Sequence, residues 1–119
     1  TVYGEDARAN MFIPKLLNNE LEYVTLHQRD FIHVSDVIEA IVLLMSNDIR
    51  LLKPAYDIGT GKVNTVQELS ITAGYDLPVK DGAACEADNN MADITELTKL
   101  GWKPKIDVNE YIIKNTIPH

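Results

Sequence analysis

The sequence predicts a small mixed α/β domain with about four helices and a few short strands. Its 119 residues suit a single domain, taken as residues 1–119, which buries roughly two-thirds of the surface of the unfolded chain. Near residue 30, β-branched and aromatic residues lead directly into a longer segment with helical apolar spacing, which indicates a strand followed by a helix. Helix-start signatures, a Thr or Asp followed by Glu three residues later, then recur at Thr65, Asp93 and Asp107.

The strand and helix within residues 28–45 organise the rest of the chain. Phe31, Ile32 and Val34 favour a short strand, and Ser35 can cap the following helix by accepting a backbone N–H. Apolar residues dominate that helix and leave few polar positions: Val37, Ile38, Ala40, Ile41, Val42, Leu43, Leu44 and Met45. We therefore expect a helix that is buried on most sides.

Shorter patterns predict the other elements. In chain order these are a helix at 11–17, strands at 21–26 and 55–58, and helices that begin at residues 66, 94 and 108. Pro14 falls in the first turn of its helix, where it is tolerated. The second strand stops at Gly59-Thr60-Gly61, but a Gly-x-Gly turn without a third glycine is a weak signal for a dinucleotide loop. We assign no cofactor-binding residue to it.

Composition and charge exclude several classes of function. A net charge of −7 and a pI near 4.8 argue against nucleic acid or an anionic membrane as the partner, since both require a basic surface. The longest apolar run, residues 40–45, is far shorter than the ~20 residues that cross a bilayer, and the first residues contain no signal sequence. The single cysteine, Cys85, cannot form an internal disulfide, and no His or Cys cluster has metal-ligand spacing. We expect a cytoplasmic protein without a metal site.

Arg29 is the most informative polar residue, because it stands where a loop enters the expected buried strand. A guanidinium held there offers planar, permanently charged donors that match phosphate or carboxylate oxygens in pairs. The alternative is a structural role, in which Arg29 binds Asp30 or a backbone carbonyl and ties down the loop. Residue type alone leaves both interpretations open.

Seven short motifs occur in an order that resembles a known family. They are Val2-Tyr3-Gly4, Ile13-Pro14-Lys15, Arg29-Asp30-Phe31-Ile32-His33-Val34-x-Asp36-Val37, Tyr56-Asp57-Ile58-Gly59-x-Gly61, Val66-x-Glu68-Leu69, Ala92-Asp93-Ile94 and Leu100-Gly101-Trp102-Lys103-Pro104. Together they resemble the C-terminal, substrate-binding part of the extended short-chain dehydrogenase/reductase family. The similar members are NAD-dependent nucleotide-sugar epimerases and dehydratases of the UDP-glucose 4-epimerase type.

The resemblance implies that the catalytic machinery lies elsewhere. In the family, the N-terminal Rossmann half carries the glycine-rich NAD loop and a catalytic Tyr-x-x-x-Lys. None of the tyrosines of this chain is followed four residues later by Lys; they are Tyr3, Tyr23, Tyr56, Tyr75 and Tyr111. We therefore expect a fold without the full doubly wound sheet, no catalytic residue, no cofactor bound by this chain alone, and NAD in the complete enzyme.

The resemblance also implies a set of substrate-binding residues. Arg29 occupies the position of the arginine that contacts the diphosphate of the sugar nucleotide. The residues expected near the base and ribose are Asn10, Met11, Phe12, Ile13 and Lys15. Asp36, Asp57 and Asp93 occupy capping or structural positions in the family. A second phosphate-binding arginine, expected near Gly82-Ala83, is missing, so affinity is expected to be weaker or aimed at a different nucleotide sugar.

Two hypotheses follow. In the first, the chain binds a nucleotide sugar and works with a Rossmann half, which docks on an exposed apolar face; a homodimer is another way to cover that face. In the second, it is a non-catalytic binding or interaction module that has kept the fold. A small hydrolase built on His33 and Asp36 is disfavoured, because His33 lies in a strand that is expected to be buried. Which sugar is bound, and whether the reaction is epimerisation, dehydration or reduction, stays open.

Overall fold

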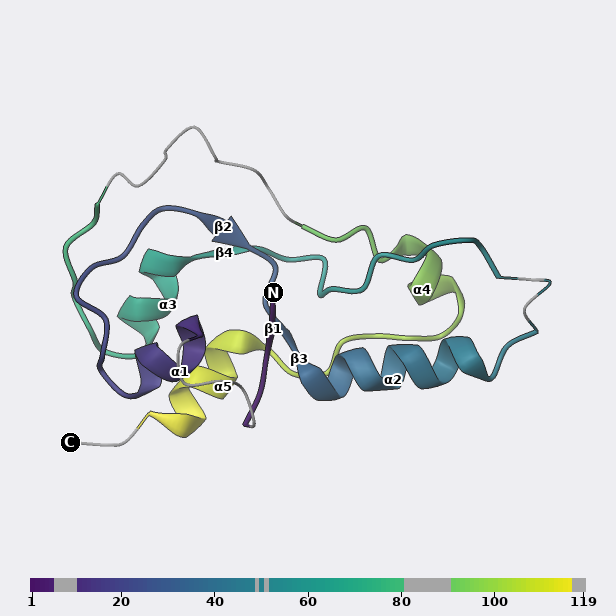
Figure 1. Cartoon of the computed structure of the whole chain (residues 1–119), viewed down its shortest axis with the longest axis horizontal. Coiled ribbons are helices and arrows are strands. Elements are labelled where there is room, and N and C mark those ends of the chain that lie inside the picture. Colours follow the sequence, from purple (N-terminus) through teal and green to yellow (C-terminus); the bar gives the residue numbers. More distant parts are fainter. Residues whose placement is uncertain (6–10, 49, 51, 81–90, 117–119) are drawn as a thin grey trace.

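The computed structural model describes residues 1–5, 11–48, 50, 52–80 and 91–116. The molecule is elongated, with principal extents of 50 × 34 × 20 Å. One end gathers three short helices around a core, and a longer helix extends from it to form an arm together with a fourth short helix (Figure 1).

Two small sheets join these parts. Strands β1 (Val2–Tyr3) and β3 (Ile32–His33) pair in parallel, with Val2 opposite Ile32. Strands β2 (Gln28–Arg29) and β4 (Asn64–Thr65) pair antiparallel, with Arg29 opposite Asn64. We call the second pair the β2–β4 ribbon; its two strands run side by side in Figure 1.

The described residues contain five helices, against the four or so expected, and the mixed α/β class is confirmed. Their bounds are α1 Phe12–Leu17, α2 Val34–Met45, α3 Val66–Thr72, α4 Thr95–Lys99 and α5 Val108–Asn115. Two predicted caps are confirmed, since Thr65 accepts the N–H of Glu68 at 3.0 Å and Asp107 accepts that of Glu110 at 3.1 Å. Asp93 instead holds Thr95, and α4 has no side-chain cap at Ile94.

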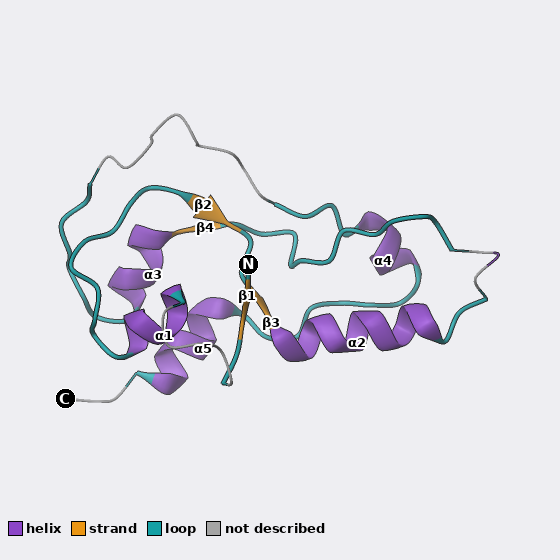
Figure 2. Cartoon of the chain, in the orientation of Figure 1, coloured by secondary structure: helices purple, strands orange, loops and turns teal. Residues whose placement is uncertain are grey.

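The expected strands at 21–26 and 55–58 are wrong. The first makes only an isolated bridge between Val24 and Val79, and the second has no regular structure, so Figure 2 draws both as loop. A strand requires a partner for its backbone, and 55–58 instead uses its side chains: Tyr56 and Ile58 pack against the core of the arm. The β-propensity of these residues was not sufficient to form a strand without a neighbouring strand to pair with.

The expected cap at Ser35 is also wrong, because the N-cap of α2 lies two residues earlier, at His33. His33 is the N-cap residue, and its Nδ1 accepts the backbone N–H of Ser35 at 3.1 Å. The other ring nitrogen, Nε2, therefore carries the proton and donates to the carboxylate of Glu5 at 3.1 Å. His33, at the end of a buried strand, therefore caps α2 in place of the predicted Ser35.

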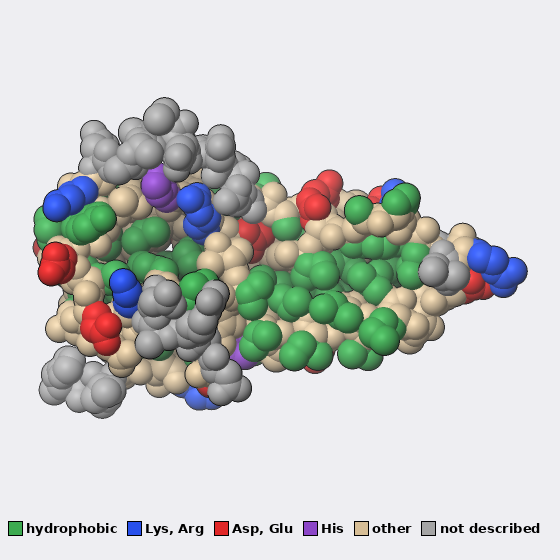
Figure 3. Space-filling model, in the orientation of Figure 1, with side chains coloured by type: hydrophobic (Ala, Val, Ile, Leu, Met, Phe, Trp, Pro, Cys, Tyr) green, Lys and Arg blue, Asp and Glu red, His purple; other side chains and the backbone are tan. Residues whose placement is uncertain are grey.

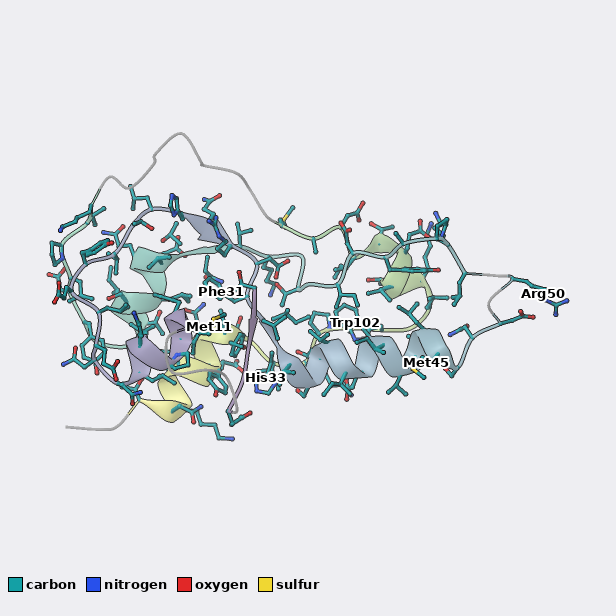
Figure 4. All side chains as sticks on the ribbon, viewed as in Figure 1. Met11, Phe31, His33, Met45, Arg50 and Trp102 are labelled. Atoms are coloured by element: carbon teal, nitrogen blue, oxygen red, sulfur yellow. The ribbon has the colours of Figure 1, made fainter. Side chains whose placement is uncertain are left out.

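Apolar side chains form two cores. The larger one joins α1, α3 and α5 to the strands and contains Tyr3, Ile13, Leu16, Phe31, Leu69, Ala73, Val108, Tyr111 and Ile112. The smaller one lies in the arm and contains Ile32, Ala40, Leu97 and Trp102. Trp102 lies against α2, as Figure 4 shows, and covers this second core as expected.

Helix α2 is not buried on most sides. Only Asp36 and Ala40 are buried, while Ile38 is 54% exposed and Met45 is 80% exposed. The exposed residues Val34, Ile38, Ile41 and Met45, spaced 4, 3 and 4 apart, form one face that we call the α2 stripe, and Val42 widens it. Hydrophobic side chains cover much of the arm in Figure 3. Of the described residues, α4 and its flanking segments cover only the opposite face of α2.

No helix in the described ranges is long and apolar enough to cross a membrane.

Candidate nucleotide-binding site

Arg29 lies on the β2–β4 ribbon, directly opposite Asn64. Its side chain is partly exposed, and Nη1 donates a 2.9 Å hydrogen bond to the carbonyl of the preceding Gln28. No carboxylate within the described ranges forms an ion pair with it. The structure therefore contains the carbonyl contact of the structural interpretation but not the contact with Asp30, and it leaves most of the guanidinium donors available.

Asp30 points away from Arg29, into the interior, where it is 3% exposed. Its carboxylate accepts the backbone N–H of Thr60 at 2.9 Å and the Thr60 hydroxyl at 2.7 Å, both on Oδ1. Its Oδ2 accepts the N–H groups of Gly61 at 3.0 Å and Ala92 at 3.1 Å. Sequence reasoning missed this cluster. The sequence features that could have indicated it are an aspartate just before the buried strand and a Gly-x-Gly turn elsewhere in the chain.

The Gly59-Thr60-Gly61 turn is shaped to fit this carboxylate. A Cβ on Gly59 would lie 2.5 Å from Cβ of Ala92 and 2.7 Å from Oδ2 of Asp30, which is too close for any side chain. Gly61 has a φ of +76°, a conformation that residues with a Cβ rarely adopt. The N–H groups of Thr60 and Gly61, which a phosphate would otherwise require, already bind Asp30.

Helix α1 supplies the other expected site residues. Phe12 and Lys15 line a cavity of about 480 Å³, whose remaining wall is Glu20, Leu21, Glu22, Tyr23, Val24, Thr25 and Val66. Met11 is the exposed N-cap residue, and Ile13 is buried in the larger core. Asn10 and the position near Gly82 lie outside the described residues. The structure thus brings two of the six predicted residues, Phe12 and Lys15, into one cavity wall.

A second, smaller cavity is lined by a residue of the ribbon. Val66 lines the larger cavity, and its N–H donates to the carbonyl of His27 at 3.2 Å, which extends the pairing of the ribbon by one step. Asn64 lines the smaller cavity of about 240 Å³, together with the exposed Lys62. The rings of Phe12 and Phe31 lie 5.8 Å apart and connect α1 to the chain that follows Arg29.

The buried Asp36 and His33 and the exposed Asp57 have structural partners. The carboxylate of Asp36 accepts the N–H groups of Lys105 and Ile106, each at 3.1 Å, and Asp57 accepts the N–H of Asp93 at 3.3 Å. The imidazole of His33 is held by Ser35 and Glu5. The part of the chain that the structure describes contains no group of three His, Cys, Asp or Glu residues that could hold a metal ion.

Comparisons with known proteins match this chain to one family. A family model described as "NAD dependent epimerase/dehydratase family" matches residues 1–59. A protein named "Putative UDP-glucose 4-epimerase" from Methanocaldococcus jannaschii is 30% identical over 120 residues, which cover 92% of this chain and 37% of that protein.

Solved structures with similar folds are also similar in sequence to this chain. MoeE5 in complex with UDP-glucose and NAD is 31% identical, with a TM-score of 0.69 over 98% of this chain and 44% of that one. UDP-glucose 4-epimerase from Thermotoga maritima with UDP-glucose is 25% identical, with a TM-score of 0.70 over 97% of this chain and 42% of that one. The chain therefore spans about two-fifths of the length of the proteins that it matches.

Proposed function

Because the chain belongs to the NAD-dependent epimerase/dehydratase family, we propose that residues 1–119 bind the nucleotide sugar for such an enzyme. The observation that carries the proposal is Arg29, a partly exposed guanidinium on a paired strand, four residues after Thr25 in the wall of the larger cavity. A fixed guanidinium suits a diphosphate, and an adjacent cavity suits a base and ribose.

Helix α1 and the larger cavity form the second half of the proposed site. At about 480 Å³ the cavity falls within the range of small-molecule sites. Phe12 and Tyr23 contribute aromatic surface, and Lys15 contributes a positive charge to the wall. Met11 at the exposed start of α1 and Asn10 before it complete the set of proposed contacts, while Ile13 supports them by packing in the core.

We propose that the chemistry depends on NAD bound by another part of the complete enzyme. NAD supplies a hydride acceptor when bound. Two features of this chain support a binding role: no tyrosine stands four residues before a lysine, and the N–H groups of the Gly59–Gly61 turn bind Asp30. The residues of this chain hold and orient the sugar nucleotide.

The α2 stripe is the proposed contact with that NAD-binding part. Contiguous exposed apolar residues on one helix face are typical of an interface, and the matched relatives are more than twice as long as this chain. A homodimer through the same stripe is the second candidate. Mixing the chain with the separately produced NAD-binding half of an epimerase, and assaying epimerisation of UDP-glucose, distinguishes a substrate module from a non-catalytic one.

Isothermal titration calorimetry with UDP-, dTDP- and GDP-sugars tests the binding proposal. We expect saturable binding of one class, weakened about 10- to 100-fold in Arg29→Ala, because a hydrogen bond to a charged group contributes about 1.5–3 kcal/mol. Arg50→Ala is the matched control, since Arg50 lies at the far end of the arm from Met11 (Figure 4) and pairs only with Asp48 among the described residues. Equal affinities of the two variants, or no binding at millimolar ligand with the NAD-binding half added, would overturn the proposal.

A further inference from the structure

The carboxylate of Asp30 is buried and is held by hydrogen-bond donors, while the N-terminal ammonium of Thr1 donates to the backbone carbonyl of the same residue at 2.8 Å. Three backbone N–H groups and one hydroxyl donate to the carboxylate in five contacts of 2.7 to 3.1 Å. Among the described residues, no ion pair forms with this carboxylate. Burying a charge without such donors is strongly unfavourable. The donors come from Thr60, Gly61 and Ala92, which lie 30, 31 and 62 positions after Asp30 in the chain. One side chain therefore holds three segments at one point.

That point lies next to a weak element. Each strand of the β2–β4 ribbon has two residues, and a two-stranded sheet of that size is marginal in water on its own. Asp30 directly follows β2, and Gly61 lies three residues before β4. Hydrogen bonds from the Thr60–Gly61 backbone to the Asp30 carboxylate thus close the ribbon at the end next to Arg29 and Asn64.

We propose that Asp30 is a positioning residue for nucleotide binding, which sets the place of Arg29 opposite Asn64 without touching the ligand. The inference rests on the proposed function for the identity of the ligand, a nucleotide. The hydrogen bonds of Asp30 come from the structure alone. When the carboxylate is lost, the ribbon loses its closure, and the Arg29 guanidinium loses its fixed position. Arg29 then has to be ordered during binding, which lowers affinity.

Asp30→Asn is the sharpest substitution, because it keeps the size and removes the charge. An amide presents one accepting oxygen and an N–H₂ group, so it cannot accept from both sides of the cluster. Asp36→Asn is the matched control: Asp36 is 1% exposed and accepts two backbone N–H groups, but its partners are Lys105 and Ile106. Both variants are expected to lose stability, and only the first is expected to disturb the ribbon.

The first measurement uses no ligand. Amide hydrogen exchange of Val66, whose N–H binds the carbonyl of His27, reports on the ribbon, and the N–H of Tyr111, which binds the carbonyl of Asp107, reports on α5. In Asp30→Asn we expect protection of Val66 to fall at least tenfold more than protection of Tyr111. In Asp36→Asn we expect no such difference. Equal loss at both amides in Asp30→Asn would overturn the positioning role even if the chain bound no nucleotide.

The second measurement is a double-mutant cycle with UDP as the probe. We expect Asp30→Asn to weaken UDP binding about tenfold and Asp36→Asn to change it less than twofold. Arg29→Ala is expected to cost much less in the Asp30→Asn background than alone, because Arg29 is no longer positioned there. Additive effects would refute the proposal. Absence of UDP binding by the unmodified chain would instead refute the proposed function, and the exchange result would still decide the role of Asp30.

Thr60 provides a conservative rescue. Thr60→Val removes the hydroxyl that donates to Oδ1 at 2.7 Å, while Thr60→Ser keeps it. We expect Thr60→Val to reduce Val66 protection and UDP affinity in the same proportion, and Thr60→Ser to retain both within twofold. A Thr60→Val variant with normal Val66 protection would contradict the proposal.

Discussion

The indole Nε1 of Trp102 donates a 3.1 Å hydrogen bond to the backbone carbonyl of Asp36, sixty-six positions earlier in the chain. The same aspartate receives the N–H groups of Lys105 and Ile106 on its carboxylate. The first turn of α2 is therefore fixed to the segment between α4 and α5 by both its backbone and its side chain. These contacts anchor the start of the arm.

Trp102→Ala is expected to lower the free energy of unfolding by about 3–5 kcal/mol, because it removes a buried ring and leaves a cavity in the second core. Trp102→Phe should cost less, since an aromatic ring still fills much of the space, although part of the indole and its hydrogen bond are lost. Urea denaturation followed by far-UV circular dichroism measures both. Met45→Ala, on a side chain that is 80% exposed, serves as the control and should change stability by less than about 0.5 kcal/mol. Comparable losses for Trp102→Ala and Met45→Ala would contradict this account of the arm.

Tyr3→Phe is expected to stabilise the protein by about 1 kcal/mol at neutral pH, because the Tyr3 hydroxyl is buried without a hydrogen-bond partner among the described residues. Chemical denaturation gives the difference directly. Tyr23→Phe, on a tyrosine that is 46% exposed, is the control and should leave stability nearly unchanged.

The same tyrosine predicts an alkaline limit. Burial raises the pKa of the Tyr3 phenol well above its usual range, and the nearby carboxylates of Asp107 and Asp36 raise this pKa further. The unfolded chain therefore loses the proton first. The contribution of neutral Tyr3 is fully present below the unfolded pKa of about 10 and is lost as the pH rises toward the folded pKa. Unfolding curves between pH 8 and 11.5 should fall more steeply for the unmodified chain than for Tyr3→Phe; parallel curves would argue against this.

Ile38→Glu is expected to suppress association through the α2 stripe. Ile38 is 54% exposed, so the substitution should change stability by less than about 0.5 kcal/mol, while the new charge opposes burial of the stripe. Sedimentation velocity of the chain mixed with the separately produced NAD-binding half should show a complex for the unmodified chain and separate components for Ile38→Glu. Ile113→Glu, on an equally apolar and 64% exposed position of α5, is the matched control. If both variants associate to the same extent, the stripe is not the contact surface.

Local sequence predicted those features whose partners lie within a few residues. The caps at Thr65 and Asp107 were predicted correctly because the accepted N–H groups belong to Glu68 and Glu110. The strand at 55–58 could not be decided in this way, because β structure depends on a neighbouring strand that the local pattern does not specify. The burial of α2 was overestimated for a related reason. An apolar helix face predicts burial, but the pattern does not specify which segment or partner covers that face.

For the candidate site, the sequence by itself determined the family, because its motifs can be recognised in order along the chain. It also predicted Arg29 and the residues of α1 as contacts, which stays a prediction. Tertiary structure alone decided that Asp30 joins Thr60, Gly61 and Ala92, that Ile13 is buried in the core, and that Phe12 and Lys15 share a cavity wall with Val66. The physical reason is distance along the chain. Hydrogen bonds between residues 30 to 62 positions apart form only after the segments have packed, and no local pattern encodes which donors a buried carboxylate will meet.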